Sequence, residues 1–209
     1  MSSLPDSYET LAAVGKAEAK IQRSRFLAEA SPAADVAAAQ AALADMRRRY
    51  HDARHVCSAW RLGVAELQVE SRNDDGEPSG SAGEPILAAI RGSGLSDLVV
   101  CVARYFGGVK LGTGGLSRAY GGVAASALAS AQRRTVRLGR HFDLSFDYPL
   151  QKTVQHLVSE HGGGTVHEGY DSSVHWRVWL PHSTADRFAL ALAETTAGRV
   201  AAVPVADDR

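Results

Sequence analysis

The sequence predicts an α+β protein of two domains, residues 1–135 and 136–209. The chain has 209 residues, 45% hydrophobic and 22% charged, which is ordinary globular composition and sufficient length for two small domains. Twelve of the 20 glycines lie between residues 76 and 122, interleaved with apolar runs, so this glycine belongs to a folded core. Beyond residue 133, segments follow in the order strand, helix, strand, strand, helix, strand, which is the order of a ferredoxin-like domain.

The first elements are expected between residues 11 and 50. Residues 11–30 contain a strand or a tight pair of strands. A helix is expected over about 32–50, because Ser31 suits the N-cap and Pro32 suits the first helical position. Three consecutive arginines at its end complement the helix dipole.

The remainder of the first domain alternates between strands, loops and helices. Residues 73–85, NDDGEPSGSAGEP, predict a loop. The other segments are paired strands at 55–62 and 65–71, a short helix at 85–94, a buried strand at 97–106, a glycine-rich loop at 107–115 and a long helix at about 116–132.

The second domain is read from its alternating and helical patterns. The final strand is expected at a sheet edge, because Pro204 has no N–H to donate to a neighbouring strand. Ser183 and Thr184 are cap candidates for the last helix. The segments are strands at 141–149, 165–170, 172–181 and 199–205, and helices at 149–161 and 183–196.

Charge and cysteine usage exclude several classes of protein. Lys+Arg 23 balances Asp+Glu 23, which excludes a globally basic nucleic-acid coat but not a local basic patch. The N-terminus has no secretory-signal pattern, and no apolar run approaches the roughly 18 residues of a membrane span, so no membrane partner is expected. Cys57 and Cys101 are too few and too far apart for a zinc knuckle, a CxxC pair or a disulfide framework. Buried, reduced thiols and a cytoplasmic location are expected.

The second glycine-rich loop is the main candidate site. It follows a strand and precedes a helix, the context in which backbone N–H groups can surround an anion. It is not a P-loop, and Ser117 stands where a dinucleotide fingerprint needs its third glycine. The alternative is that these glycines only permit tight turns and close packing. The candidate nucleic-acid or anion-binding residues are Arg104, Gly107, Gly108, Lys110, Gly112, Gly114, Gly115 and Arg118.

The first glycine-rich loop carries three acids. Asp74, Asp75 and Glu77 are a possible Mg²⁺ site, although Asp and Gly are also common turn formers. Apart from this possible Mg²⁺, no cofactor is expected. No HExxH or GxSxG motif is present, so no catalytic residue is assigned.

Four stretches of the chain resemble the YigZ/IMPACT family. They are SRF (24–26), DARHVCSAW (52–60), DDGEPSGSAGEPIL (74–87) and VARYFGGVKLGTGGLSRAYGG (102–122). The resemblance covers about residues 15–130 and implies a first domain like the second domain of ribosomal protein S-five. The remainder resembles the C-terminal domain of bacterial members, which is similar to the fifth domain of elongation factor G. Eukaryotic members restrain a starvation-activated translation kinase through a scaffold protein, for which they use an N-terminal RWD module. That module is not expected in this chain, so the kinase role is not carried over.

Three hypotheses follow. The preferred one is a non-enzymatic binder of RNA or a ribosome-associated component, with a role in translation regulation, as the resemblance implies. The second is a metal-assisted enzyme that acts on a nucleotide or a phosphorylated small molecule, with the acidic loop holding the metal. The third is a protein-interaction module whose glycine loops are purely architectural. The oligomeric state is not indicated by the sequence.

Overall fold

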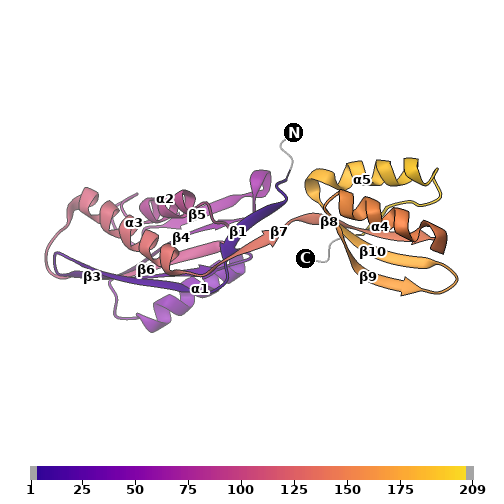
Figure 1. Cartoon of the computed structure of the whole chain (residues 1–209). Coiled ribbons are helices and arrows are strands. Elements are labelled where there is room, and N and C mark those ends of the chain that lie inside the picture. The colour runs from indigo at the N-terminus through magenta and orange to yellow at the C-terminus, as the bar shows by residue number, and fades with distance from the viewer. Residues whose placement is uncertain (1–3, 206–209) are drawn as a thin grey trace. The chain divides into compact units, whose positions relative to one another are not determined.

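The computed structural model describes residues 4–205 and confirms the mixed α+β, two-domain fold (Figure 1). One compact unit comprises residues 8–136. The other comprises residues 137–205 together with residues 4–7, although the sequence assigned those first residues to the first domain. No helix among the described residues is long and apolar enough to cross a membrane.

The first unit is built on an antiparallel sheet of five strands in the order β2-β3-β6-β4-β5. A separate pair of strands, β1 and β7, forms a small second sheet. The strands are β1 (Ser7–Leu11), β2 (Gly15–Ile21), β3 (Ser24–Pro32), β4 (His55–Leu62), β5 (Val69–Asn73), β6 (Leu98–Tyr105) and β7 (Arg133–Arg137). The helices are α1 (Val36–Arg49), the short 3-10 helix η1 (Ala65–Leu67), α2 (Gly83–Ser93) and α3 (Gly112–Ser130).

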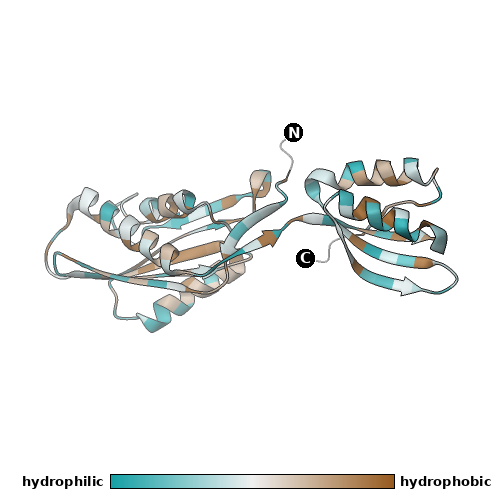
Figure 2. Cartoon of the chain, viewed as in Figure 1, coloured by the Kyte–Doolittle hydropathy of each residue, from teal (hydrophilic) through white to brown (hydrophobic). Residues whose placement is uncertain are grey.

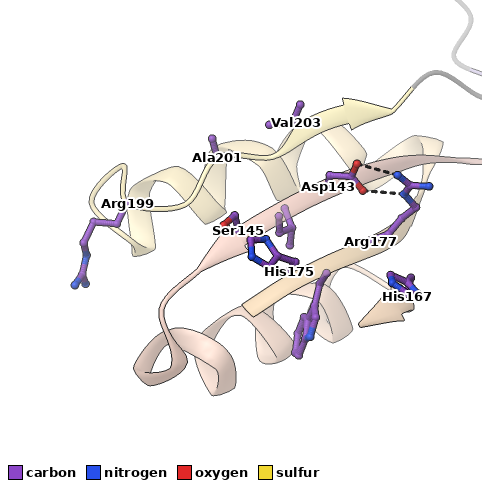
Figure 3. Close-up of a pocket in the computed structure, with 10 residues that line it drawn as sticks. Asp143, Ser145, His167, His175, Arg177, Arg199, Ala201 and Val203 are labelled. Carbon is purple, nitrogen blue, oxygen red and sulfur yellow. Dashed lines mark hydrogen bonds and ion pairs between the residues drawn. The ribbon is translucent and has the colours of Figure 1, made fainter. Parts of the chain in front are cut away.

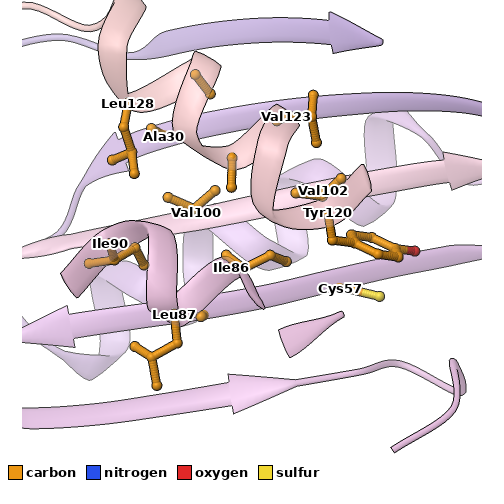
Figure 4. Close-up of a cluster of buried hydrophobic side chains, with 14 of the residues drawn as sticks. Ala30, Cys57, Ile86, Leu87, Ile90, Val100, Val102, Tyr120, Val123 and Leu128 are labelled. Atoms are coloured by element: carbon orange, nitrogen blue, oxygen red, sulfur yellow. The ribbon is translucent and has the colours of Figure 1, made fainter. Parts of the chain in front are cut away.

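The central strand, β6, has apolar side chains on both faces, and helices cover each face of this sheet. Its residues are apolar from Leu98 to Ala103 and all of these are buried, which is the pattern of a strand covered on both sides (Figure 2). Val100 and Val102 pack under α2 and α3, whereas Val99 and Cys101 pack against α1. Figure 4 shows the first of these cores, with side chains from Ile86, Leu87, Ile90, Tyr120, Val123 and Leu128 gathered over the sheet.

Two helices begin at other residues than the sequence indicated. Ser31 and Pro32 belong to the end of β3, and α1 begins at Val36, where the carboxylate of Asp35 accepts the N–H of Ala38 at 2.7 Å. The earlier cap prediction was wrong because sheet pairing with β6 extends β3 as far as Pro32. Similarly, α3 begins at Gly112 rather than near 116.

The two cysteines are free and buried, as expected from the sequence. They lie on neighbouring strands, β4 and β6, but Cys57 faces the core under α2 and α3 while Cys101 faces α1. Because side chains on opposite faces of a sheet cannot meet, the two sulfurs are kept apart by the fold. Burial raises the pKa of both thiols to about 12.

The second unit has the predicted ferredoxin-like order of elements. Its antiparallel sheet has the order β11-β8-β10-β9. Its elements are β8 (Gly139–Phe146), η2 (Tyr148–Leu150), α4 (Gln151–Glu160), β9 (Gly164–Tyr170), β10 (Val174–Pro181), α5 (His182–Thr195) and β11 (Val203–Val205). Alternate residues of β8 and β10, including Phe142 and Trp176, form one core with α4 and α5. Pro204 lies on an edge strand, as predicted.

The cap of α5 differs from the prediction. Ser183 and Thr184 lie inside the helix rather than at its cap. The carboxylate of Asp6 accepts both the N–H of Ser183 at 2.8 Å and its hydroxyl at 2.5 Å. A residue from the start of the chain therefore provides the acceptor that a local cap would have supplied.

Candidate anion-binding site

A pocket of about 580 Å³ lies at one end of the five-stranded sheet of the first unit. Strand β6 ends there and the antiparallel strand β4 begins beside it, so His55 and Arg104 are directly paired. The loop before α2 and the start of α3 supply the other walls. The lining residues are Arg54, His55, Gly76, Glu77, Pro78, Arg104, Phe106, Lys110, Leu111, Gly112, Thr113 and Leu116.

The pocket carries an excess of positive charge. Its ionic lining consists of Arg54, Arg104 and Lys110 against one carboxylate, Glu77. Arg54 and Lys110 are exposed, and neither forms an ion pair with another described residue. Since Glu77 is already bound to Arg104, the two exposed cations are available to an anion from solution.

The N-terminus of α3 adds to this positive potential. In the described chain no side chain caps it, because the N-cap residue is Leu111. By contrast, the N-terminus of the neighbouring helix α2 is occupied by Asp74, whose Oδ1 accepts the N–H groups of Ala82 at 3.0 Å and Gly83 at 2.8 Å. A helix of 19 residues with free N–H groups at a cationic pocket is a favourable place for a phosphate.

Arg104 forms the floor of the pocket and is only 5% exposed. Its Nη1 donates to Oε1 of Glu77 at 2.6 Å, and the hydroxyl of Tyr120 donates to the same oxygen at 2.7 Å. Burial raises the pKa of Tyr120, so this hydroxyl remains protonated and can donate. The Nε of Arg104 is buried without a hydrogen-bond partner, and Nη2 has only a long contact of 3.4 Å to Ser24. The guanidinium of Arg104 therefore has N–H donors for which the protein provides no good acceptor.

His55 and Phe106 complete the chemistry of the lining. Nδ1 of His55 lies 2.7 Å from the carbonyl oxygen of Asp75, and because a carbonyl can only accept, this nitrogen carries the proton. The ring of Phe106 is 40% exposed and lies 5.6 Å from the guanidinium of Arg54 and 5.5 Å from that of Arg104. The cations and the aromatic ring thus hold one another in position.

The three acids of the first glycine-rich loop do not converge. Asp74 accepts backbone N–H groups around the start of α2. Burial acts to raise the pKa of Asp74, but the hydrogen bonds from Gly80, Gly83 and Ala82 outweigh it and leave the pKa below its usual value.

The other two acids of this loop, Asp75 and Glu77, each have partners in other parts of the first unit. Asp75 binds Arg47 at 2.6 Å and the N–H of Val56 at 2.7 Å, and Glu77 belongs to the Arg104 pair. Among residues 4–205, no three His, Cys, Asp or Glu side chains are placed to hold a metal ion.

A second, larger depression of about 870 Å³ lies on the uncovered face of the sheet in the second unit (Figure 3). His167 and His175 line it, but its central charges neutralise each other, because Arg177 donates twice to Asp143 at 2.8 and 2.9 Å. We therefore assign the candidate site to the smaller pocket, where two of the three cations, Arg54 and Lys110, form no ion pair with a described residue. The term cationic pocket is used for it below.

The structure divides the residues proposed from the sequence into two groups. Arg104, Lys110 and Gly112 line the cationic pocket. The others lie near it without lining it: Gly107 and Gly108 in the loop after β6, and Gly114, Gly115 and Arg118 in the first two turns of α3. Arg104 is buried in an ion pair rather than presented to solvent.

Arg54 and His55 were not among the residues proposed from the sequence. They lie about 50 positions before Arg104, and only the pairing of β4 with β6 brings them to the pocket. The available signal was their position in DARHVCSAW, one of the stretches that resembles the YigZ/IMPACT family.

Comparisons with known proteins extend over both units. Residues 22–128 match the Impact N-terminal domain, and residues 144–199 match a domain of unknown function, DUF1949. The chain is 36% identical over 182 residues to "IMPACT family member YigZ" of Escherichia coli, covering 86% of this chain and 88% of that protein. It is 32% identical over 193 residues to "IMPACT family member YvyE" of Bacillus subtilis, covering 92% of this chain and 88% of that protein.

A solved structure gives the same assignment of fold. It is described as the crystal structure of a hypothetical protein, and it matches with a TM-score of 0.65 and 32% identity. The match covers 98% of this chain and 100% of that one. Both domain matches and the full-length relatives agree, and the chain belongs to the IMPACT family.

Proposed function

We propose that this protein is a non-enzymatic RNA-binding factor, associated with the ribosome in the cytoplasm and acting in translation regulation, and that its cationic pocket binds phosphate. The proposal rests on two exposed cations, Arg54 and Lys110, which form no ion pair within residues 4–205 and line the same pocket as the start of α3. Phosphate groups are common anions that bind favourably both at a helix N-terminus and to clustered basic side chains.

The positions of the acids favour binding over metal-assisted catalysis. Asp74, Asp75 and Glu77 each accept hydrogen bonds from a different part of the protein. To hold Mg²⁺ or serve as a general base, each would have to give up these partners. A binding role requires no change in the hydrogen-bond partners of the three carboxylates.

The test is fluorescence anisotropy with labelled single-stranded RNA, duplex RNA and DNA at several salt concentrations. Affinity should fall as salt rises, since each neutralised phosphate releases counterions. The double variant Arg54→Ala/Lys110→Ala should weaken binding and reduce the salt slope for single strands by about 0.7 for each lost phosphate contact.

The matched control is Lys152→Ala/Arg187→Ala, which removes one lysine and one arginine from exposed helix positions in the second unit. This control should bind like the wild type. Equal weakening by the two double variants would indicate a non-specific charge effect. Absence of binding to all three nucleic acids at low salt would contradict the proposal and favour a protein-interaction module.

A further inference from the structure

The cationic pocket has the dimensions of a site for one small molecule rather than for a continuous strand. Its volume of about 580 Å³ lies within the range of roughly 300–1,000 Å³ typical of small-ligand pockets. Proteins that follow a polynucleotide backbone use an extended basic groove instead. A nucleic acid would therefore place a single nucleotide in this pocket rather than a run of several.

We infer that the cationic pocket binds a terminal nucleotide that carries a phosphomonoester, as found at a phosphorylated end of RNA. The inference rests on the proposed function and specifies the substrate class of the same site. The 5′- and 3′-phosphorylated ends share this chemistry, and the experiment below distinguishes them.

The charge of the lining supports a phosphomonoester over an internal phosphodiester. Three cationic side chains and one carboxylate leave an excess of two positive charges. A phosphomonoester carries about −1.5 to −2 at neutral pH, compared with −1 for each internal phosphate. The terminal group is therefore the better electrostatic match, with the α3 N–H groups as additional donors.

The floor of the pocket supplies an independent observation. Arg104 is a buried side chain that lines the pocket, and its Nε has no partner within the protein. Buried donors are normally satisfied, and the only bond of the Nη2 group is the long contact of 3.4 Å to Ser24. The guanidinium therefore has donor capacity that the protein does not use, and a phosphate is a strong acceptor for an arginine.

The remaining wall accounts for the nucleoside part. Four apolar residues line the same pocket as the cations, and we call them the apolar wall: Pro78, Phe106, Leu111 and Leu116. Bases and sugars present flat or apolar surfaces that pack against aromatic and apolar side chains and guanidinium planes. The pocket therefore offers cations for the phosphate and apolar side chains for the nucleoside, the two chemical halves of a nucleotide.

The experiment compares three 12-nucleotide RNAs of one sequence, with a 5′-phosphate, a 3′-phosphate or hydroxyl groups at both ends, each labelled internally. We expect one of the phosphorylated RNAs to bind about tenfold more tightly than the hydroxyl RNA, the equivalent of one charged hydrogen bond. This preference should be lost in Arg54→Ala/Lys110→Ala and retained in Lys152→Ala/Arg187→Ala. Circular dichroism establishes that each variant is folded.

A second variant tests the nucleoside half of the site. Phe106→Ala should weaken competition by a nucleoside monophosphate more than competition by inorganic phosphate. Both ligands depend on the cations that the ring holds in position, but only the nucleotide also contacts the apolar wall. Phe106 is 40% exposed, so the substitution should leave the fold intact. Equal effects on the two competitors would overturn the assignment of the wall.

The outcomes separate this inference from the proposed function. If all three RNAs bind equally and all are weakened by Arg54→Ala/Lys110→Ala, the protein is an RNA-binding factor but the end-specific inference is wrong. If no RNA binds, both fail. If a nucleoside monophosphate binds while RNA does not, the pocket serves a free nucleotide and the RNA end is excluded.

Discussion

Arg104 and Glu77 form a charged pair inside the first unit, with side chains only 6% and 4% exposed. Two charges removed from water are tolerated only while they compensate each other. Oε1 of Glu77 receives donors from both Arg104 and Tyr120, so the carboxylate links β6 to α3 beneath the cationic pocket. The pair is thus a structural support for the candidate site.

We expect Glu77→Gln to lower the free energy of unfolding by about 3–5 kcal/mol, because it leaves a buried guanidinium without a counter-charge. Urea denaturation measures this. Glu84→Gln is the control, since Glu84 forms exposed ion pairs with Arg72 and Arg91 that should contribute about 1 kcal/mol or less. Similar losses of unfolding free energy in both variants would show that burial does not increase the contribution of the Arg104–Glu77 pair.

Gly107 fixes the loop that leads from β6 into the pocket. A Cβ at this position would lie 2.1 Å from the carbonyl oxygen of Arg23 in the β2–β3 turn. Gly107→Ala should therefore cost about 1–3 kcal/mol through displaced backbone. Gly122→Ala, in α3 with open space around it, should instead stabilise by up to about 1 kcal/mol. Thermal unfolding of the two variants should shift in opposite directions, and a shared direction would contradict the close-approach argument.

At the scale of single elements, helix α2 depends on an acceptor outside itself. Asp74 accepts three backbone N–H groups, from Gly80, Ala82 and Gly83. Asp74→Ala should cost about 0.5–2 kcal/mol, the usual range for loss of an N-terminal cap. Because the folded-state pKa of Asp74 is lowered, its contribution is present above the unfolded pKa and is lost as pH falls through the folded value. A variant as stable as the wild type at pH 7 would contradict this role.

Strands β4 and β6 protect one thiol each, on opposite faces of the sheet. With the pKa of Cys57 and Cys101 raised to about 12, the thiolate fraction at pH 8 should be roughly a thousandfold below that of an unfolded chain. A thiol-specific chromogenic reagent should react with neither cysteine until denaturant is added. The associated stability is complete below the unfolded pKa of about 8.5 and is lost as pH rises towards 12. Fast labelling of the native protein would contradict this burial.

Local patterns predicted most elements, and pairing between distant elements accounts for the errors. The apolar run of β6 and the glycines before α3 are visible in the sequence because each depends on neighbouring residues. The start of α1 and the approach of Arg54 to Arg104 depend on which strand lies beside β6, and sequence periodicity carries no information about that choice. The candidate site was consequently predicted on β6 and at the start of α3, but not on its β4 side, where Arg54 and His55 lie.

At the scale of the whole molecule, the two units have separate cores. Phe188 is fully buried in the second, where its ring centroid lies 6.1 Å from that of Phe142. Phe188→Ala should cost about 3–5 kcal/mol and raise amide exchange in residues 137–205, while β6 retains its protection. Leu190→Ala, at a 66% exposed position of the same helix, should change little. A uniform loss of protection across both units would show a single cooperative structure.

The contact of Asp6 with Ser183 has a consequence for biosynthesis. The two residues are 177 positions apart, so the acceptor for α5 leaves the ribosome long before the helix that needs it. In the intervening time the whole of residues 8–136 is synthesised and can fold, since domains generally fold in order of emergence. The unit that contains both Asp6 and Ser183 is therefore completed last. Translation that stops near residue 136 would leave residues 8–136 folded while Asp6 still lacks the helix whose N–H group it accepts.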